Sequence, residues 1–391
     1  DVTLVGQGMT ATTIDGNDLD RVLEVRPGAS LKVRDLEITG GEPECGAPGG
    51  GVYAAGDLDL LRVRLSGNVS GDCAGRVTGE DGGDGGGVFC SHSGLTVVDS
   101  KIVFNRTGMG AEGEPGASST CSEGPKVGGP GGYGGDGGGI AADGCTAVVE
   151  GTRVGGNFTG FGGRGGTGGS SNAPAWCMVH PGAAGGEGGN GGLGGGISLA
   201  SGSARITGST IWDNQVGAGG SGGWGGHGEG GDPDGSGGDG GDSGNGGGVA
   251  NLGAVTVIAE STISGNGCRS SGCDGGEGGI GAEDGRGARG GGIYTSGGSG
   301  ALDLSVDRCS VHSNRSQNGG GIFNWYGTME LVNTTIAENA AVYDGVGVTD
   351  YPNGAGSATR VSFCTIARNT GRSYGYLATG DPLILDNSII A

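Results

Sequence analysis

Aliphatic residues recur along the chain at fixed distances from a series of asparagines. One aliphatic residue lies three positions before each asparagine, and another lies eight positions before it. Two such positions with a polar turn between them predict two short β-strands in every repeat. The asparagines are Asn68, Asn105, Asn157, Asn214, Asn266, Asn314, Asn339 and Asn369. The aliphatic residues are Leu65, Ile102, Val154, Ile211, Ile263, Val311, Ile336 and Ile366, and Leu60, Val97, Val149, Ile206, Ile258, Val306, Leu331 and Val361.

A Gly-Gly-Gly-Val/Ile segment precedes most of these asparagines and predicts a third strand. The distance from its aliphatic residue to the asparagine is 17 positions in five of seven cases. The aliphatic residues are Val52, Val88, Ile140, Ile197, Val249, Ile293 and Ile322. Near the start, Leu31, Val33, Leu36 and Ile38 fit an opening coil with Gly41 in place of the asparagine. Leu383, Leu385, Ser388 and Ile390 begin a last coil that the sequence does not finish.

This periodicity predicts an all-β fold, a right-handed parallel β-helix of about ten coils with three strands each. One coil cannot bury its own apolar face, but coils stacked ~4.8 Å apart share hydrogen bonds and bury like residues against each other. The asparagines would then share one turn, where their amides form a ladder. We expect residues 1–391 to form a single β-helix domain, able to self-associate through its ends.

Glycine-rich inserts leave five successive coils at the same corner. They occupy 69–84, 106–136, 158–193, 215–245 and 267–289, whereas the next insert, 315–318, has only four residues. Their glycine pairs keep a period of three, which is the pitch of a polyproline-II helix rising ~3.1 Å per residue. Glycine chains of this form can pack side by side because no Cβ separates them. We therefore expect a side layer of polyglycine-II-type helices; flexible linkers are the alternative.

Ten cysteines without metal-site spacing indicate an oxidising, extracellular compartment. Cys309 and Cys364 each lie five positions before an asparagine, in one inward column two coils apart. That separation is about 9.6 Å, beyond the ~6.8 Å limit for disulfide Cα atoms, so we expect both thiols to be free and buried. The pairs that we predict for the other eight are Cys45–Cys73, Cys90–Cys145, Cys121–Cys177 and Cys268–Cys273.

Composition limits the function classes. Glycine contributes 105 of the 391 residues, and the net charge of −21 comes with no basic cluster. An acidic surface repels phosphate backbones, so we expect no nucleic-acid partner. No stretch approaches the ~20 apolar residues of a transmembrane segment. The start at Asp1, with neither Met nor an apolar leader, is typical of a secreted protein whose signal peptide has been removed.

Catalytic acids of a β-helix enzyme would lie at the outward-facing positions of the coils. Parallel β-helix enzymes that act on polysaccharides need carboxylates on adjacent coils. Neither the column six positions before the asparagines nor the column one position before them places acids on adjacent coils. We therefore expect no enzyme, no catalytic residues and no cofactor.

Calcium is an alternative ligand of the inserts. Residues 131–136 and 237–242 match the first six positions of the Gly-Gly-x-Gly-x-Asp calcium nonapeptide. Asp136, Asp239 and Asp242 are therefore candidate metal ligands. The nonapeptide's aliphatic residue is missing, however, and no tandem copy follows, so these acids could instead keep the glycine layer soluble.

The segments 261–266 (Ser-Thr-Ile-Ser-Gly-Asn) and 319–322 (Gly-Gly-Gly-Ile) resemble repeats of bacterial right-handed β-helix surface proteins. Closest in pattern are the polymorphic outer-membrane protein repeats, and the resemblance spans about residues 20–391 outside the inserts. It implies a secreted or cell-surface bacterial protein, often an adhesin or passenger domain. The inserts resemble the polyglycine-II bundles of certain phage adhesins and cold-adapted arthropod proteins.

Together these observations predict an extracellular structural or adhesive β-helix protein, with an end-to-end filament subunit as one form of it. Its expected partners are a carbohydrate or a host surface. Two alternatives stay open: a polysaccharide-active β-helix enzyme and an ice-binding protein.

Overall fold

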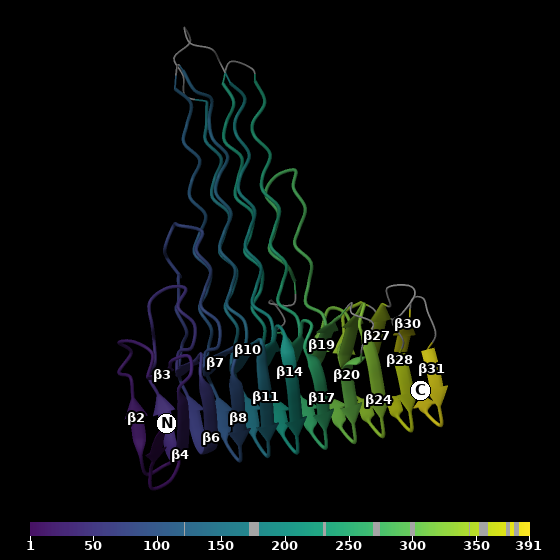
Figure 1. Cartoon of the computed structure of the whole chain (residues 1–391). Helices are drawn as coiled ribbons and strands as arrows, with labels where there is room; N and C mark the ends of the chain where they lie inside the picture. Colours follow the sequence, from purple (N-terminus) through teal and green to yellow (C-terminus); the bar gives the residue numbers. More distant parts are fainter. Residues whose placement is uncertain are drawn as a thin grey trace.

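The computed structural model describes residues 1–120, 122–171, 180–229, 232–268, 274–297, 302–343, 345–351, 359–372, 376–378 and 383–391. The chain forms a rod of stacked coils with the two termini at opposite ends, and long glycine-rich loops project from one side (Figure 1). The strands form a 20-stranded, a 10-stranded and a two-stranded sheet, and their pairings are parallel. Within the described ranges, no helix is long and apolar enough to cross a membrane.

Each coil contributes three strands, as predicted. The first column contains β1 (Val2–Val5), β4 (Ser30–Thr39), β6 (Asp57–Ser66), β8 (Gly94–Val98), β11 (Cys145–Glu150), β14 (Gly202–Thr207), β17 (Val255–Ala259), β20 (Leu302–Asp307), β24 (Thr328–Val332), β28 (Thr359–Ser362) and β31 (Leu383–Asp386). The second contains β2 (Thr13–Asp15), the later halves of β4 and β6, β9 (Lys101–Val103), β12 (Arg153–Gly155), β15 (Thr210–Trp212), β18 (Thr262–Ser264), β21 (Ser310–His312), β25 (Thr335–Ala337), β29 (Thr365–Ala367) and β32 (Ile389–Ile390).

The third column is the 10-stranded sheet, and it begins at the Gly-Gly-Gly segments. It contains β3 (Leu23–Val25), β5 (Val52–Ala54), β7 (Val88–Ser91), β10 (Ile140–Asp143), β13 (Ile197–Leu199), β16 (Val249–Asn251), β19 (Ile293–Ser296), β23 (Ile322–Trp325), β27 (Val348–Tyr351) and β30 (Tyr376–Ala378). The small third sheet pairs β22 (Arg315–Ser316) with β26 (Ala340–Ala341).

The strand register confirms the predicted aliphatic columns. Ile206 pairs with Ile258 in the first column, and Ile211 pairs with Ile263 in the second. These side chains are at most 1% exposed and belong to one core cluster that runs along the rod. Full burial of such a side chain contributes ~1.5–3 kcal/mol, so the summed columns stabilise a coil that contains little other apolar material.

The sequence pattern missed one partial coil and one strand of a later coil. β1 and β2 form a partial coil before the one expected to open the rod, since Val2 pairs with Leu31 and Ile14 with Ile38. The missed strand begins at Val348, which opens the coil of Asn369 and pairs with Ile322 although its preceding segment, residues 345–347, reads Gly-Val-Gly. The pattern failed here because the register needs an inward aliphatic residue at each coil but tolerates departures from the glycine triplet.

A continuous asparagine ladder runs through the coils, as predicted. The Nδ2 of each asparagine donates to the Oδ1 of the next over seven links of 2.9–3.1 Å, from Asn68 to Asn369. In the centre, Asn214 Nδ2 also donates to the carbonyl of Val154. Its Oδ1 accepts from both the backbone N–H and the Nδ2 of Asn157. At the first coil Gly41 takes the asparagine's place and donates its N–H to Asn68 Oδ1.

The glycine triplets and the asparagines occupy the same corner. A Cβ on Gly196 would lie 2.9 Å from Asn214 Nδ2 and 2.6 Å from the carbonyl oxygen of Gly248. Real Cβ atoms do not approach other atoms so closely, so the third glycine of the triplet makes room for the ladder. Gly194, the first of this triplet, has a φ of +64°, a left-handed conformation that favours glycine.

The first prediction concerns the ladder. Asn214→Ala removes one rung and leaves the N–H and Nδ2 of Asn157 without their acceptor inside the rod. A buried unsatisfied group costs ~1–3 kcal/mol, so we expect the free energy of unfolding to fall by about 3 kcal/mol, measured as a lower urea midpoint. Asn190→Ala is the control because Asn190 is exposed and its side chain accepts one hydrogen bond, from Asp242. If the two substitutions lowered the free energy of unfolding equally, the ladder would not be a source of stability.

Candidate functional site

The glycine-rich inserts form an ordered layer beside the rod, which we call the glycine layer. Each long insert has an outgoing leg and a return leg, visible as the tall hairpins in Figure 1. The described outgoing legs are 106–118, 158–170, 215–227 and 274–279, and the return legs are 126–136, 181–193, 234–245 and 283–289. Outgoing legs bond to each other at every third residue: Gly162 donates to Ala218, Gly165 to Ser221 and Gly168 to Trp224. This repeat is that expected of polyproline-II-type helices.

Hydrogen bonds also join the outgoing legs to the return legs. Gly163 donates its N–H to Gly132 on the return leg of the preceding insert, and it accepts from Gly189 on the return leg of its own. A Cβ on Gly163 would overlap the carbonyl oxygen of Ala111. The legs therefore pack on backbone contacts that only glycine permits, which fixes their order without an apolar core.

The third position of each triplet points outward, so the layer carries rows of side chains on two faces. On the outgoing legs, the Phe158 and Phe161 rings lie 5.3 Å apart in an edge-to-face arrangement. The Arg164 guanidinium lies 5.0 Å from the centre of the Trp224 ring on the next leg. Trp224 is 63% exposed and Phe161 41%. We call this aromatic and basic surface the outgoing face.

The return legs carry acids and amides instead, and these side chains tie the legs together. The Oδ1 of each candidate calcium ligand accepts a backbone N–H from the next leg: Asp136 from Leu193, Asp239 from Glu283 and Asp242 from Arg286. Asn190 and Asn245 make the same kind of contact. These carboxylates thus have a structural role that the sequence analysis missed. The signal was present, because short Asp and Asn side chains recur at the third positions of return legs.

Asp136 and Asp242 also line one shallow groove of about 300 Å³ on this return face, together with the Tyr133 ring and the Asn190 amide. Asp239 is not among the residues that line this groove. Across the described residues, the grouping close enough to share a metal is Cys45, Cys73 and Glu80, whose two cysteines form a disulfide. Calcium binding at the three acids stays a prediction.

Burial changes the titration of the acids at the base of the return face. It raises the pKa of Asp136 to about 7, with the charge of Asp84 adding to the effect and the hydrogen bond from Leu193 opposing it. Burial also raises the pKa of Asp84, whose Oδ1 accepts the Asp136 N–H at 2.7 Å. The folded layer therefore holds these protons more tightly than an unfolded chain does.

Two of the predicted disulfides are present: Cys45–Cys73 and Cys90–Cys145, with Cα separations of 4.7 and 6.4 Å. Cys268 is also disulfide-bonded. Its predicted partner Cys273 lies outside the described residues, as do both members of the predicted Cys121–Cys177 pair. The first bridge joins residues of two neighbouring coils at the corner where the inserts begin.

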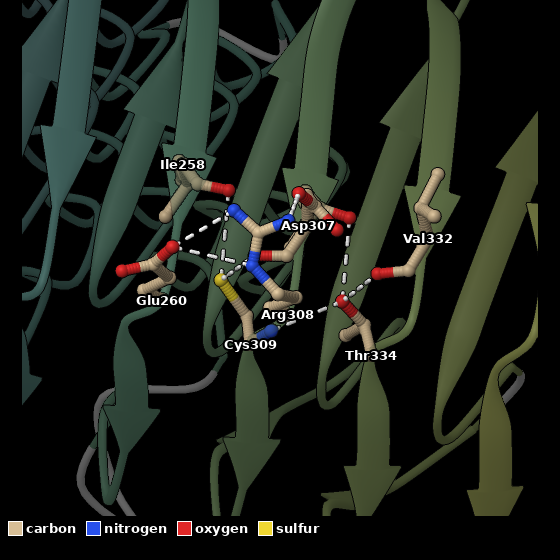
Figure 2. Close-up of polar contacts among 8 residues, drawn as sticks. Ile258, Glu260, Asp307, Arg308, Cys309, Val332 and Thr334 are labelled. Carbon is tan, nitrogen blue, oxygen red and sulfur yellow. Dashed lines mark hydrogen bonds and ion pairs between the residues drawn. The ribbon is translucent and has the colours of Figure 1, made fainter.

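Cys309 and Cys364 are free and buried, as predicted. Figure 2 shows Cys309 in a column of hydrogen bonds between coils, with its Sγ 3.5 Å from the Ile258 carbonyl and its N–H donating to Thr334 Oγ1. Hydroxyl groups fill this column in other coils, for example Ser209, which accepts the Thr152 N–H. Burial raises the pKa of the Cys309 thiol to about 11. The cysteines therefore replace serine or threonine in a second internal ladder.

The outward columns in which catalytic acids were sought are turn positions. Asp35, Arg62 and Arg308 have φ values of 49–55°. Their side chains pair across coils: Arg62 binds Asp35 at 2.6 Å, and Arg308 binds Glu260 at 2.8 Å (Figure 2). The hydrogen bond from Arg62 lowers the pKa of Asp35. These exposed pairs contribute little stability and mark the rod surface away from the glycine layer.

A second prediction follows from the raised pKa of Asp136. The ordinary value is 3.8 and the folded value about 7, so the folded state binds the proton more tightly and loses stability as the pH rises through this range. Asp136→Asn keeps the Oδ1 acceptor and removes the charge. We expect a higher thermal midpoint than wild type at about pH 8 and little difference at about pH 4. Asp239→Asn, at an exposed position, serves as control; an effect of Asp136→Asn that does not depend on pH would contradict the argument.

Thermal scans of the same samples with added calcium chloride test the predicted calcium binding at the three acids.

A third prediction concerns the hydroxyl ladder. Cys309→Ser preserves its hydrogen bonds, whereas Cys309→Val keeps the size of the side chain but cannot accept the backbone N–H of Ser261. We expect Ser to change the free energy of unfolding by less than about 1 kcal/mol and Val to lower it by about 1–3 kcal/mol. Urea unfolding measures both; a valine variant as stable as the serine variant would show that the column is merely apolar.

No protein-family model, curated protein or solved structure matches the chain.

Proposed function

We propose that the protein is an extracellular structural or adhesive module whose glycine layer is a rigid recognition surface. One observation carries the proposal: outgoing legs are hydrogen-bonded to each other and to the return legs, so the third-position side chains stand in fixed rows. A surface that is ordered before binding loses little conformational entropy when a partner docks. This arrangement suits recognition of an extended partner.

The composition of the two faces supports recognition rather than mere spacing. The outgoing face exposes Phe161, Trp224 and the Arg164 guanidinium, residue types enriched at binding hot spots. The return face offers carboxylates, amides and the exposed ring of Tyr133. Such different faces on one layer favour binding of a surface or polymer.

A bacterial cell-surface location belongs to the same proposal. It is supported by the resemblance of the coil repeats to bacterial β-helix surface proteins and by the disulfides Cys45–Cys73 and Cys90–Cys145, which persist in oxidising compartments. The net charge of −21 keeps the exposed glycine layer soluble outside the cell.

The test compares the adhesion of the wild-type protein with that of a variant in which a substitution disrupts the glycine layer. Gly163→Ala forces a methyl group against the Ala111 carbonyl, whereas Gly124→Ala is a matched control because the nearest atom to its Cβ lies 3.6 Å away. We expect Gly163→Ala to make the inserts susceptible to protease. It should also weaken adhesion of labelled protein to whole bacterial cells, cellulose or chitin particles by about tenfold or more. Gly124→Ala should behave as wild type.

Other outcomes identify the alternatives. If protease cleaves the inserts of Gly163→Ala but the variant still adheres as strongly as wild type, the proposal is wrong. Release of reducing ends from polysaccharide would show an enzyme, and thermal hysteresis lost in Gly163→Ala would show an ice-binding protein. Filaments in electron micrographs of the wild type would place the layer along an assembled fibre.

A further inference from the structure

A cleft of about 530 Å³ lies where the glycine layer ends. The layer stops abruptly because the insert 267–289 is followed by one of only four residues. The last legs form one wall, and the following coils supply the rest through Gln317 and Tyr343. Its polar lining includes Glu277, Asp284, Arg286 and Arg289. This cleft belongs to neither face of the layer described above.

The edge that forms the cleft is closed to a further glycine leg. Inside the layer, short side chains such as Asp242 and Asn245 accept N–H groups from the next return leg. The last return leg instead has Glu283, Arg286 and Arg289 at these positions. Long charged side chains protect an edge against addition of another strand. A second copy of the glycine layer therefore does not fit this edge, and the polar groups of the cleft suit a ligand of another kind.

The cleft walls are held in place before any ligand binds. The Arg289 guanidinium lies over the rings of Phe323 and Trp325, at 5.6 and 5.0 Å from their centres. The backbone N–H of Arg289 donates to Asn245 Oδ1. The Tyr343 N–H donates to the carbonyl of Gln317 at 2.9 Å. Gln317 is buried, and its amide is hydrogen-bonded to Asp274. Such preorganisation favours a specific site.

We propose that this cleft binds a neutral oligosaccharide, an inference that rests on the proposed adhesive function and names its ligand class. Sugar hydroxyls both donate and accept, which suits a cleft lined by the carboxylates of Glu277 and Asp284 and by Arg286. Tyr343 lines the cleft and is 44% exposed, with the Arg372 guanidinium 5.8 Å from the centre of its ring. An exposed aromatic ring can pack against the C–H groups of a sugar. Glycines in the wall allow close approach to peptide groups. The net charge of −21 disfavours polyanionic chains.

The experiment is calorimetric titration of the full chain with malto-, cello-, xylo- and chito-oligosaccharides, and with uronate oligomers as the charged comparison. We expect a neutral series to bind and the uronates to bind more weakly. Glu277→Gln and Arg286→Ala should each weaken binding by about tenfold. Arg286→Ala leaves the backbone bond to Asp242 intact. Glu24→Gln and Arg26→Ala, an exposed ion pair in the N-terminal coils, are matched controls and should bind as wild type.

Three results would overturn the assignment. No binding of any neutral series, or tighter binding of uronates, would remove the ligand class. Wild-type affinity in both cleft variants would remove the site, and if Gly163→Ala alone abolished binding, the faces of the layer would hold the sugar instead. None of these results determines the outcome of the adhesion assay with Gly163→Ala. The assignment of the cleft as a sugar site can therefore be wrong while the proposed function is right.

Discussion

The structure depends on one close contact, found in seven coils, between the ladder asparagine and the third glycine of the triplet. The amide of Asn214 fills the space that a Cβ on Gly196 would need, and from there it bonds to the coil above and the coil below. Because the same amide serves two coils, every coil must have the same rise and the same turn. The aliphatic columns supply most of the burial energy, whereas the ladder fixes the register in which they stack.

The glycine layer follows from this regularity. Its long inserts begin one residue after a ladder asparagine, so a constant rise of the rod places successive outgoing legs at hydrogen-bonding distance. The row Arg106, Phe158, Gln215 and Gly267 shows this, since each residue pairs with the next directly beyond the ladder. The legs can then pack on backbone contacts, with Asp and Asn side chains bridging the return legs. The rod thus aligns a layer that has no apolar core of its own.

Much of the fold was predictable because its signals are local and repeated. The aliphatic columns, the ladder and the free thiols of Cys309 and Cys364 were predicted from spacing to the asparagines. Two of the predicted disulfides are also present. The strand at Val348 was missed because the segment before it reads Gly-Val-Gly and not Gly-Gly-Gly. The bridging role of Asp136, Asp239 and Asp242 was missed because it depends on which legs are neighbours. The end cleft was missed because it combines residues from an insert with Gln317 and Tyr343 of the following coils.

Hydrogen–deuterium exchange of the backbone amides tests the central claim most directly, since it reports order in the rod and in the layer at once. Peptides covering 158–170 and 181–193 should exchange as slowly as those of the neighbouring strands β13 and β15. Their slow exchange should be lost, together with that of the coil, when Asn214 is replaced by alanine. Legs that exchange at the rate of a free chain while β13 and β15 remain protected would contradict the account.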